Sequence, residues 1–365
     1  MSVITIKNLS RKFPNRQVLK DLSFEIHDGE FTVITGLKES GKTTFIRTLC
    51  GLDAVESGEI YVDGVLINKL EPKDRNMALI TDTVPLNQNA SVFDNMAMGM
   101  KLRKYPKEEI DSKVNKACEI LGLTEYVRRL VKNLTPGLKY RVLLARAIAR
   151  EPNIIVVDDI LKGVEAGLKK ELRAEMLKLN RRLGINFVYA TSDSIDALTL
   201  ADKIAFLEGG VLTQYGTTEE LYDHPATLPI ATFFGQPEIN LFVGNLTEEG
   251  NVYYFEAEGW KIRINNVSDE QKVKKYLAKN KPVTLAVRAE DFIMDENGEF
   301  SAVVSDCDEY AGGKQISILY SDLTGNGVYF NVSLKLEPEE KVRLSVPTNR
   351  LLIYDTETED LINKN

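Results

Sequence analysis

Alternating apolar and polar residues predict short strands in the first 70 positions of the chain. Residues 4–9 and 21–35 alternate in this way, and the Asp-Gly dipeptide at 28–29 is typical of a tight hairpin turn. Residues 57–68 predict a second hairpin. The chain therefore begins with β structure interrupted by turns.

Apolar residues spaced three or four positions apart predict helices further along. Residues 42–52 carry a short helical pattern that Gly51 ends, and residues 91–150 are largely helical in pattern. In the segment 106–123, the apolar positions that mark one helix face are Ile110, Val114, Ala117 and Leu121.

A fully apolar strand comes next, because four branched apolar residues at 154–157 are followed by Asp158. A strand that is apolar on both faces is typical of the interior of a parallel sheet. A charged helix over 166–184 and a strand over 185–191 follow it. This alternation of strand and helix, with the helical segment inserted, predicts an α/β core.

The composition changes after about residue 236. From there, short β-like runs alternate with turns rich in Gly, Asn and Asp, which predicts a small barrel or sandwich. These runs cover residues 243–265, 282–294, 314–334 and 341–355. We therefore expect two domains, 1–235 with a helical subdomain at about 86–150, and a β-rich domain at 236–365.

Composition and charge narrow the classes of function. The 365-residue chain is 43% apolar and 27% charged, as ordinary globular proteins are. Its formal net charge of −8 opposes nucleic-acid binding, so no nucleic-acid partner is expected. No apolar run approaches the roughly 20 residues that cross a bilayer, and the first 13 residues do not read as a signal peptide. Three widely spaced cysteines (Cys50, Cys118 and Cys307) show no metal or disulfide spacing, so we expect a reduced, cytoplasmic compartment.

The segment 36–43 matches the phosphate-loop pattern without a mismatch, between a β-like run and a helical one. In such a loop, backbone N–H groups and the helix N-terminus face the phosphates, the lysine bridges the β- and γ-phosphates, and the hydroxyl binds Mg²⁺. The alternative is a chance glycine-rich turn before a helix. The candidate nucleotide-binding residues here are Gly36, Leu37, Lys38, Glu39, Ser40, Gly41, Lys42, Thr43 and Thr44.

Two aspartates end the apolar strand. Phosphate-loop ATPases use an acidic residue at this place to hold the Mg²⁺ shell, so Asp158 is predicted to join Thr43 at the metal; the alternative is a salt-bridged strand end. Asp159 stands where a general base would activate water. Its carboxylate is about 1.5 Å (one C–C bond) shorter in reach than that of glutamate. Because a misplacement near 1 Å can cost about a hundredfold in rate, we expect Asp159 to be a weakened base.

Motifs along nearly the whole chain make it resemble the ATP-binding subunits of ABC transporters, especially those that drive maltose, oligosaccharide or glycerol-phosphate importers. Besides the phosphate loop, they lie at residues 70–76, 91–104, 141–159, 198–210, 216–226 and 283–291. The resemblance implies an α/β phosphate-loop domain with a helical insertion, a C-terminal β-barrel-like regulatory domain of OB type, and the cofactors ATP and Mg²⁺. It also implies that Phe13 stacks on adenine with Val18 nearby; the alternative is that Phe13 is an ordinary core residue.

The chain departs from the family pattern at four places, and all four affect turnover in the family. Ser192 stands in place of the switch histidine, which leaves a hydrogen-bond donor without charge. Asp82 stands in place of a glutamine, so it offers only acceptors, although it remains a candidate Mg²⁺ ligand. The loop after Asp159 has Ile160 for proline and Glu165 for aspartate. The signature motif, which contacts the partner subunit's ATP in the family, reads Leu134, Thr135, Pro136, Gly137 and Leu138.

These departures predict a subunit that binds ATP but hydrolyses it poorly, paired with a second, non-identical ABC ATPase; a slow but competent ATPase is the alternative. The resemblance implies a peripheral protein at the cytoplasmic face of the membrane. Its partners would be two permease subunits, contacted by residues 86–105, and indirectly an extracytoplasmic solute-binding protein. Residues 86–105 read equally as an amphipathic core helix. A regulatory pseudo-ATPase remains open, whereas a translation or repair factor fits poorly because the chain has one phosphate loop.

Overall fold

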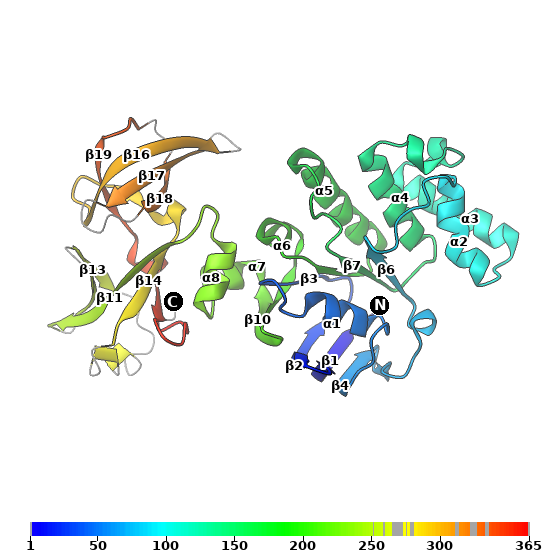
Figure 1. The fold of residues 1–365 in the computed structure, drawn as a ribbon, viewed down its shortest axis with the longest axis horizontal. Coiled ribbons are helices and arrows are strands. Elements are labelled where there is room, and N and C mark those ends of the chain that lie inside the picture. Colours follow the sequence, from blue (N-terminus) through cyan, green and yellow to red (C-terminus); the bar gives the residue numbers. More distant parts are fainter. Residues whose placement is uncertain are drawn as a thin grey trace. The chain divides into compact units, whose positions relative to one another are not determined.

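A computed structural model describes residues 2–250, 252–257, 260–264, 273–274, 276–277, 281–310, 314–321, 327–332 and 336–363. The chain forms two compact units, Met1–Thr218 and Glu219–Asn365. Figure 1 traces both along the sequence. Cys50 and Cys118 are buried free thiols, and the side chain of Cys307 lies outside the described residues.

A six-stranded sheet forms the centre of the first unit, in the order β10-β9-β3-β8-β7-β6. All neighbours in it are parallel except β10, which runs antiparallel to β9. Its strands are β3 (Phe31–Gly36), β6 (Met77–Thr81), β7 (Ile154–Asp158), β8 (Asn186–Ala190), β9 (Lys203–Glu208) and β10 (Val211–Thr217). The predicted α/β core is confirmed, and the four apolar residues of β7 are fully buried, as a central parallel strand requires.

A second, antiparallel sheet of the first unit has the order β2-β1-β4-β5. Its strands are β1 (Ile4–Phe13), β2 (Arg16–Ile26), β4 (Ser57–Val62) and β5 (Val65–Leu66). The hairpin predicted at 57–68 is confirmed by the pairing of Val62 with Val65. The hairpin predicted at 28–29 is wrong, because β2 pairs with β1 while β3 enters the parallel sheet. The physical reason is burial: every residue of β3 is buried, whereas β2 buries one face.

Helices cover the parallel sheet and form the predicted insertion. They are α1 (Lys42–Leu49), α2 (Val92–Leu102), α3 (Lys107–Leu121), α4 (Pro136–Ile148), α5 (Ala166–Leu183) and α6 (Ser194–Leu200), with 3-10 turns η1 (Pro72–Asp74), η2 (Thr124–Tyr126) and η3 (Val131–Asn133). Figure 1 shows α2, α3 and α4 gathered together, and α4 packs against β6. The predicted apolar face of α3 is confirmed, since all four of its marker residues are buried. Within the described chain, no helix combines the length and apolar content that crossing a membrane requires.

The second unit is built from two five-stranded antiparallel sheets, ordered β13-β12-β11-β14-β20 and β15-β19-β16-β17-β18. This agrees with the β-rich, barrel-like domain predicted from the sequence. Its strands are β11 (Asn240–Glu249), β12 (Val252–Ala257), β13 (Trp260–Ile264), β14 (Val283–Val287), β15 (Ile293–Met294), β16 (Phe300–Tyr310), β17 (Lys314–Ser321), β18 (Gly327–Val332), β19 (Lys341–Ser345) and β20 (Leu352–Asp355). Two 3-10 turns, η4 (Ala289–Asp291) and η5 (Thr348–Arg350), lie between strands.

The division between the units lies at 218/219, earlier than the composition change near 236. The cause is α8 (Leu228–Phe234), which follows α7 (Thr218–Asp223). Ala231 of α8 is buried in one cluster with Ala286 of β14 and Tyr354 of β20. The helical segment before residue 236 therefore belongs with the β-rich unit, although its local pattern resembles that of the first unit.

Candidate functional site

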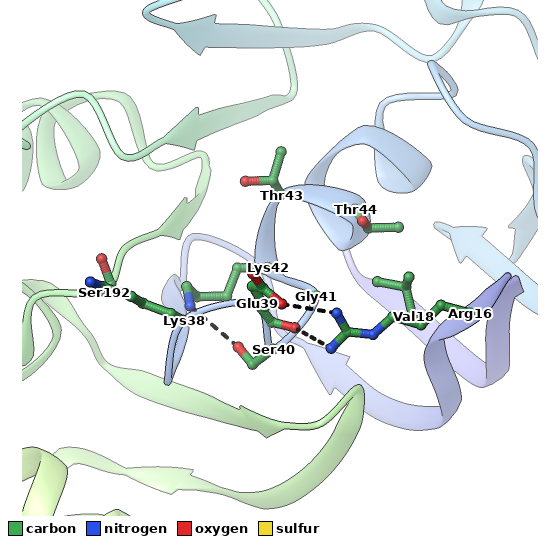
Figure 2. A pocket seen from close by; sticks show the side chains of 10 residues that line it. All are labelled: Arg16, Val18, Lys38, Glu39, Ser40, Gly41, Lys42, Thr43, Thr44 and Ser192. Atoms are coloured by element: carbon green, nitrogen blue, oxygen red, sulfur yellow. Dashed lines mark hydrogen bonds and ion pairs between the residues drawn. The ribbon is translucent and has the colours of Figure 1, made fainter. Parts of the chain in front are cut away.

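The phosphate-loop segment borders a cavity of about 330 Å³ at the carboxyl end of β3. In Figure 2, Ser192 lies at one end of this cavity and Arg16 and Val18 lie at the other, with the loop between them. Parallel strands bring their carboxyl ends to one edge of a sheet, which is where binding sites of such folds lie. The lining residues are Arg16, Val18, Lys38, Glu39, Ser40, Gly41, Lys42, Thr43, Thr44 and Ser192.

Two glycines are required by the shape of the loop. Gly36 has φ +137°, and a Cβ there would lie 2.0 Å from the carbonyl oxygen of Leu207. Gly41 has φ +102°, and a Cβ there would lie 2.9 Å from the Val18 oxygen. Gly41 also precedes α1, whose N-terminus receives no side-chain cap from the residues described. The first N–H groups of α1 therefore remain donors for an anion, which the helix dipole also favours.

Lys42 holds its ammonium group inside the loop. Its Nζ donates to the carbonyl oxygens of Gly36 (2.9 Å) and Leu37 (2.7 Å), and to Oγ of Ser40 (3.2 Å). Burial lowers the pKa of Lys42, and the nearby carboxylates of Asp159 and Asp158 oppose that shift. The arrangement is a partly desolvated cation at the N-terminus of a helix, where phosphate oxygens would replace the carbonyl partners.

Thr43 and Asp158 meet across the sheet edge, with the Thr43 hydroxyl donating to Oδ1 of Asp158 at 3.2 Å. Burial raises the pKa of Asp158, the Thr43 hydrogen bond opposes this, and the charges of Asp159 and Asp82 add to it. A divalent cation would relieve this crowding of negative charge. Among the described residues, no group of three or more His, Cys, Asp or Glu side chains could form a protein cage for a metal. A hydroxyl and one carboxylate fit Mg²⁺, which keeps most of its water and phosphate ligands.

Asp82 follows β6 directly, next to the end of β7, because Thr81 pairs with Asp158. It is exposed and is not among the residues that line the cavity. Its Oδ1 accepts a long hydrogen bond of 3.4 Å from Thr81 Oγ1. The structure thus brings Asp82 near Asp158 through the strand pairing, and not through a direct contact.

Asp159 turns the chain out of β7 with φ +45°. Its N–H donates to the Ala190 oxygen at 2.9 Å, and its Oδ1 accepts from Thr191 Oγ1 at 3.2 Å. Burial raises the pKa of Asp159. The carboxylate is therefore held toward the end of β8, where one of its oxygens already has a donor.

The loop that carries Ser192 is fixed by an ion network that sequence analysis missed. Asp196 is fully buried and accepts from Arg173 Nε at 2.6 Å and from the Tyr189 hydroxyl at 3.1 Å. Lys169 donates to Asp193 Oδ2 at 2.6 Å, and Asp193 caps α6 by accepting from the Asp196 N–H. The Asp-x-x-Asp cap spacing was the only local signal of this network.

Phe13 and the signature residues 134–138 are not among the residues that line the cavity. Thr135 caps α4 by accepting from the Leu138 N–H at 3.4 Å, and Pro136 occupies the first helical position, where proline is tolerated. Phe13 ends β1 and is 38% exposed, which does not fit an ordinary core phenylalanine; the Arg11 guanidinium lies 4.9 Å from its ring centroid. Arg16, which sequence analysis missed, lines the cavity and pairs with Glu39 at 3.0 Å.

The residues of the signature segment, 134–138, differ in burial and in their contacts. Leu134 is buried, and a Cβ on Gly137 would lie 3.2 Å from a methyl carbon of Leu168. None of residues 134–138 is among the residues that line the cavity. The structure therefore places the phosphate loop, Asp158, Asp159 and Ser192 at one sheet edge, and leaves the signature segment at the start of α4.

Comparison with known proteins agrees with this architecture. Residues 19–162 match the model of the ABC transporter family. The sn-glycerol-3-phosphate import ATP-binding protein UgpC of Ruegeria sp. (strain TM1040) is 33% identical over 362 residues, 98% of each chain. The trehalose/maltose import ATP-binding protein MalK of Thermococcus litoralis is 37% identical over 262 residues, 70% of each chain.

Solved structures support the fold of the first unit. cbiO1 from Clostridium perfringens, part of the ABC transporter complex cbiONQ, superimposes with a TM-score of 0.55 at 22% identity, over 60% of this chain and 89% of that one. An ATP-binding cassette of an ABC transporter in its ADP conformation gives a TM-score of 0.56 at 23% identity, over 62% and 96%. The chain belongs to the ABC transporter family, among the import ATP-binding proteins represented by UgpC and MalK.

Proposed function

We propose that this chain is the ATP-binding subunit of an importer for a sugar or a glycerol phosphate, and that it binds MgATP but turns it over slowly. Its similarity to UgpC and MalK over most of the chain supports the importer assignment. The single observation that carries the nucleotide assignment is the phosphate loop, with Lys42 inside it and Thr43 in contact with Asp158. The subunit would work at the cytoplasmic face of the membrane with two permease subunits.

Different residues of the site would bind the phosphates, the adenine and the Mg²⁺ ion. Lys42 and the first N–H groups of α1 would hold the phosphates, and Phe13 and Val18 would contact the adenine side. Thr43 and Asp158 would hold Mg²⁺, with Asp82 as a further oxygen ligand beside them. The bound metal would neutralise charge on the phosphates. Ser192, at the end of the cavity, would donate a hydrogen bond to a phosphate oxygen.

Slow turnover follows from the side chains that face the attacking water. Asp159 is shorter than the glutamate that the family pattern has there, and Thr191 already occupies one of its oxygens. Ser192 supplies no positive charge, because a hydroxyl does not ionise in this range. The signature segment adds a third defect, since Pro136 lacks an N–H and Leu138 lacks an amide side chain.

These defects favour a pair with a second, intact ATPase. In the family arrangement each ATP lies between one subunit's phosphate loop and the other's signature motif. A self-paired chain would combine all the defects in both sites. In a mixed pair, the ATP on this chain's phosphate loop would contact the intact signature motif of the partner. The ATP on the partner's phosphate loop would have an intact base and switch histidine. We propose that this subunit holds ATP longer while its partner does most of the hydrolysis.

ATP turnover by the purified chain tests the proposal. We expect the chain to bind nucleotide and to hydrolyse it slowly. The double variant Asp159→Glu/Ser192→His should raise the hydrolysis rate by about tenfold to a hundredfold, because glutamate restores the reach of the base and histidine restores the positive charge. The matched control is Asp111→Glu/Ser112→His on α3, where both changes lie outside the site. Lys42→Ala should abolish binding.

Two results would contradict the proposal. One is a self-paired chain that hydrolyses ATP at an ordinary enzymatic rate, about 1 to 1,000 per second. The other is a double variant no faster than the control pair. Purification with two permeases supports the transport role, whereas ATP-dependent pairing without any permease would favour a regulatory pseudo-ATPase.

A further inference from the structure

A polar cavity of about 280 Å³ lies wholly within the second unit, apart from the phosphate loop. This volume lies just below the usual range for small-molecule pockets, about 300–1,000 Å³. Its walls come from α7, η4, η5 and the start of β20, which are far apart in the sequence. The described residues that line it are Asp223, His224, Arg288, Asp291, Asn349, Arg350 and Leu352.

Arg288 lines this cavity and carries a hydrogen-bond donor that has no acceptor among the described residues. The residue is 5% exposed, and its guanidinium lies 3.7 Å from the ring centroid of Tyr222. Its Nη2 donates to the Tyr222 carbonyl oxygen at 2.5 Å, whereas its Nη1 is buried and finds no acceptor among the described residues. A buried, charged N–H without a partner is costly, so the position calls for an acceptor that the protein itself does not supply.

Arg350 and two carboxyl groups line the cavity together with Arg288. Arg350 Nη1 pairs with Asp223 at 2.9 Å, and its Nε lies 3.9 Å from Asp291. The Asp291 side chain is 13% exposed, and burial together with the Glu290 charge raises its pKa to about 6. Glu290 in turn accepts a hydrogen bond from the Tyr222 hydroxyl. Two guanidinium groups therefore face two carboxyl groups, and the Asp291 carboxyl becomes uncharged only below about pH 6.

We propose that this cavity binds a small metabolite through a phosphate or carboxylate group, with the guanidinium groups of Arg288 and Arg350 as its donors. Oxyanions of both types match guanidinium geometry and form short, charge-assisted hydrogen bonds with it. A metal cation is a poor match for the site, because both arginines would repel it. The proposal does not depend on ATP hydrolysis, since every lining residue belongs to the second unit.

Isothermal titration calorimetry on the full chain tests the site. Because the phosphate loop also attracts anions, the titrations use a Lys42→Ala background. The probes are inorganic phosphate, sulfate and succinate, so that tetrahedral anions and carboxylates are compared. We expect binding of at least one probe, and Arg288→Lys and Arg350→Gln should each weaken it by at least about tenfold. Arg343→Gln, an exposed arginine of the same unit, is the matched control.

The probe that binds identifies the type of anionic group that the cavity accepts. Binding of phosphate and sulfate alone supports a phosphate-bearing ligand, and binding of succinate alone supports a carboxylate. If Arg288→Lys fails to fold, the half-exposed Arg350→Gln decides. The proposal is overturned if no probe binds, or if both cavity variants bind the probes as tightly as Arg343→Gln does. In the second case the anion binds elsewhere on the chain.

Discussion

At the residue scale, the candidate site of the first unit is built from side chains at or just after the ends of buried parallel strands. Asp158 ends β7, Asp159 leaves it with a positive φ, and Ser192 stands two residues after β8. Where the family pattern expects a base and a switch histidine, this chain has Asp159 and Ser192, whose side chains are shorter or uncharged. We therefore expect binding and turnover to separate in this chain, because the residues proposed to hold phosphate and metal match the family pattern.

Asp291 gives a pH-dependent prediction in the second unit. Its pKa rises from 3.8 to about 6 on folding, mainly through burial. As the pH increases from about 4 to 6, the unfolded chain loses this proton first, so the folded state loses stability and the penalty is complete above pH 6. We expect Asp291→Asn to stabilise the second unit at pH 7.5 by about 1–3 kcal/mol.

Thermal unfolding of the two proteins at several pH values measures this effect. The gain from Asp291→Asn should vanish near pH 3.5, where both states carry the proton. Asp295→Asn, at an exposed carboxylate of the same unit, should show no such trend. A gain that is constant from pH 3.5 to 7.5 would show that ionisation of Asp291 is not its cause.

At the element scale, the phosphate loop depends on how closely β3 approaches β9. Gly36 ends β3 and pairs with Leu207 in the parallel register. The chain can turn there into the loop and α1 only because no Cβ occupies the space beside the Leu207 oxygen. The shape of the loop is therefore set by a neighbouring strand as well as by its own glycines.

Replacing Gly36 by alanine should separate backbone strain from steric conflict. Gly64, in the β4–β5 turn, has φ +75°, and a Cβ there would meet no atom within 4 Å, so Gly64→Ala is the matched control. Both variants carry the strain of a positive φ, and only Gly36→Ala also meets a backbone oxygen at 2.0 Å. We expect Gly36→Ala to be less stable than Gly64→Ala by about 1–3 kcal/mol in urea unfolding followed by circular dichroism. Equal losses of stability in the two variants would mean that β9 moves away from the new Cβ without a measurable free-energy cost.

At the scale of the whole molecule, each unit has a hydrophobic core of its own. One buried cluster runs through the first unit, from Ile4 to Leu207, and another joins both sheets of the second unit, from Phe242 to Ile362. The single tryptophan of the chain, Trp260, is buried in the second core. Its fluorescence therefore reports on the second unit, whereas far-ultraviolet circular dichroism reports on both.

This separation predicts two different responses to nucleotide. MgATP at about 100 times its Kd should stabilise the unit that binds it by about 2.7 kcal/mol. We expect the circular-dichroism transition of the first unit to move to higher temperature while the Trp260 transition moves less. Lys42→Ala should remove the shift. An equal shift of both signals would show that the units unfold as one cooperative block.

Much of the fold was readable from the sequence, because its signals are local. The phosphate loop is a contiguous pattern, the apolar run of β7 marks a central strand by itself, and the spacing of apolar residues in α3 marks its buried face. The error at residues 28–29 arose because a turn signal does not say which sheet the next strand joins. The division of the units was similarly hidden, since only packing on β14 and β20 assigns α8 to the second unit.

The sequence by itself determined the family architecture, the phosphate loop and the substitutions at Asp82, Asp159 and Ser192, because each depends on residue type at a fixed chain position. Only the tertiary structure decided what surrounds them. The hydrogen bond from Thr191 to Asp159 and the partly buried Arg173–Asp196 pair join residues that are far apart along the chain. The cavity around Arg288 and Arg350 depends entirely on such pairings, since no local pattern records where a buried guanidinium lacks its acceptor.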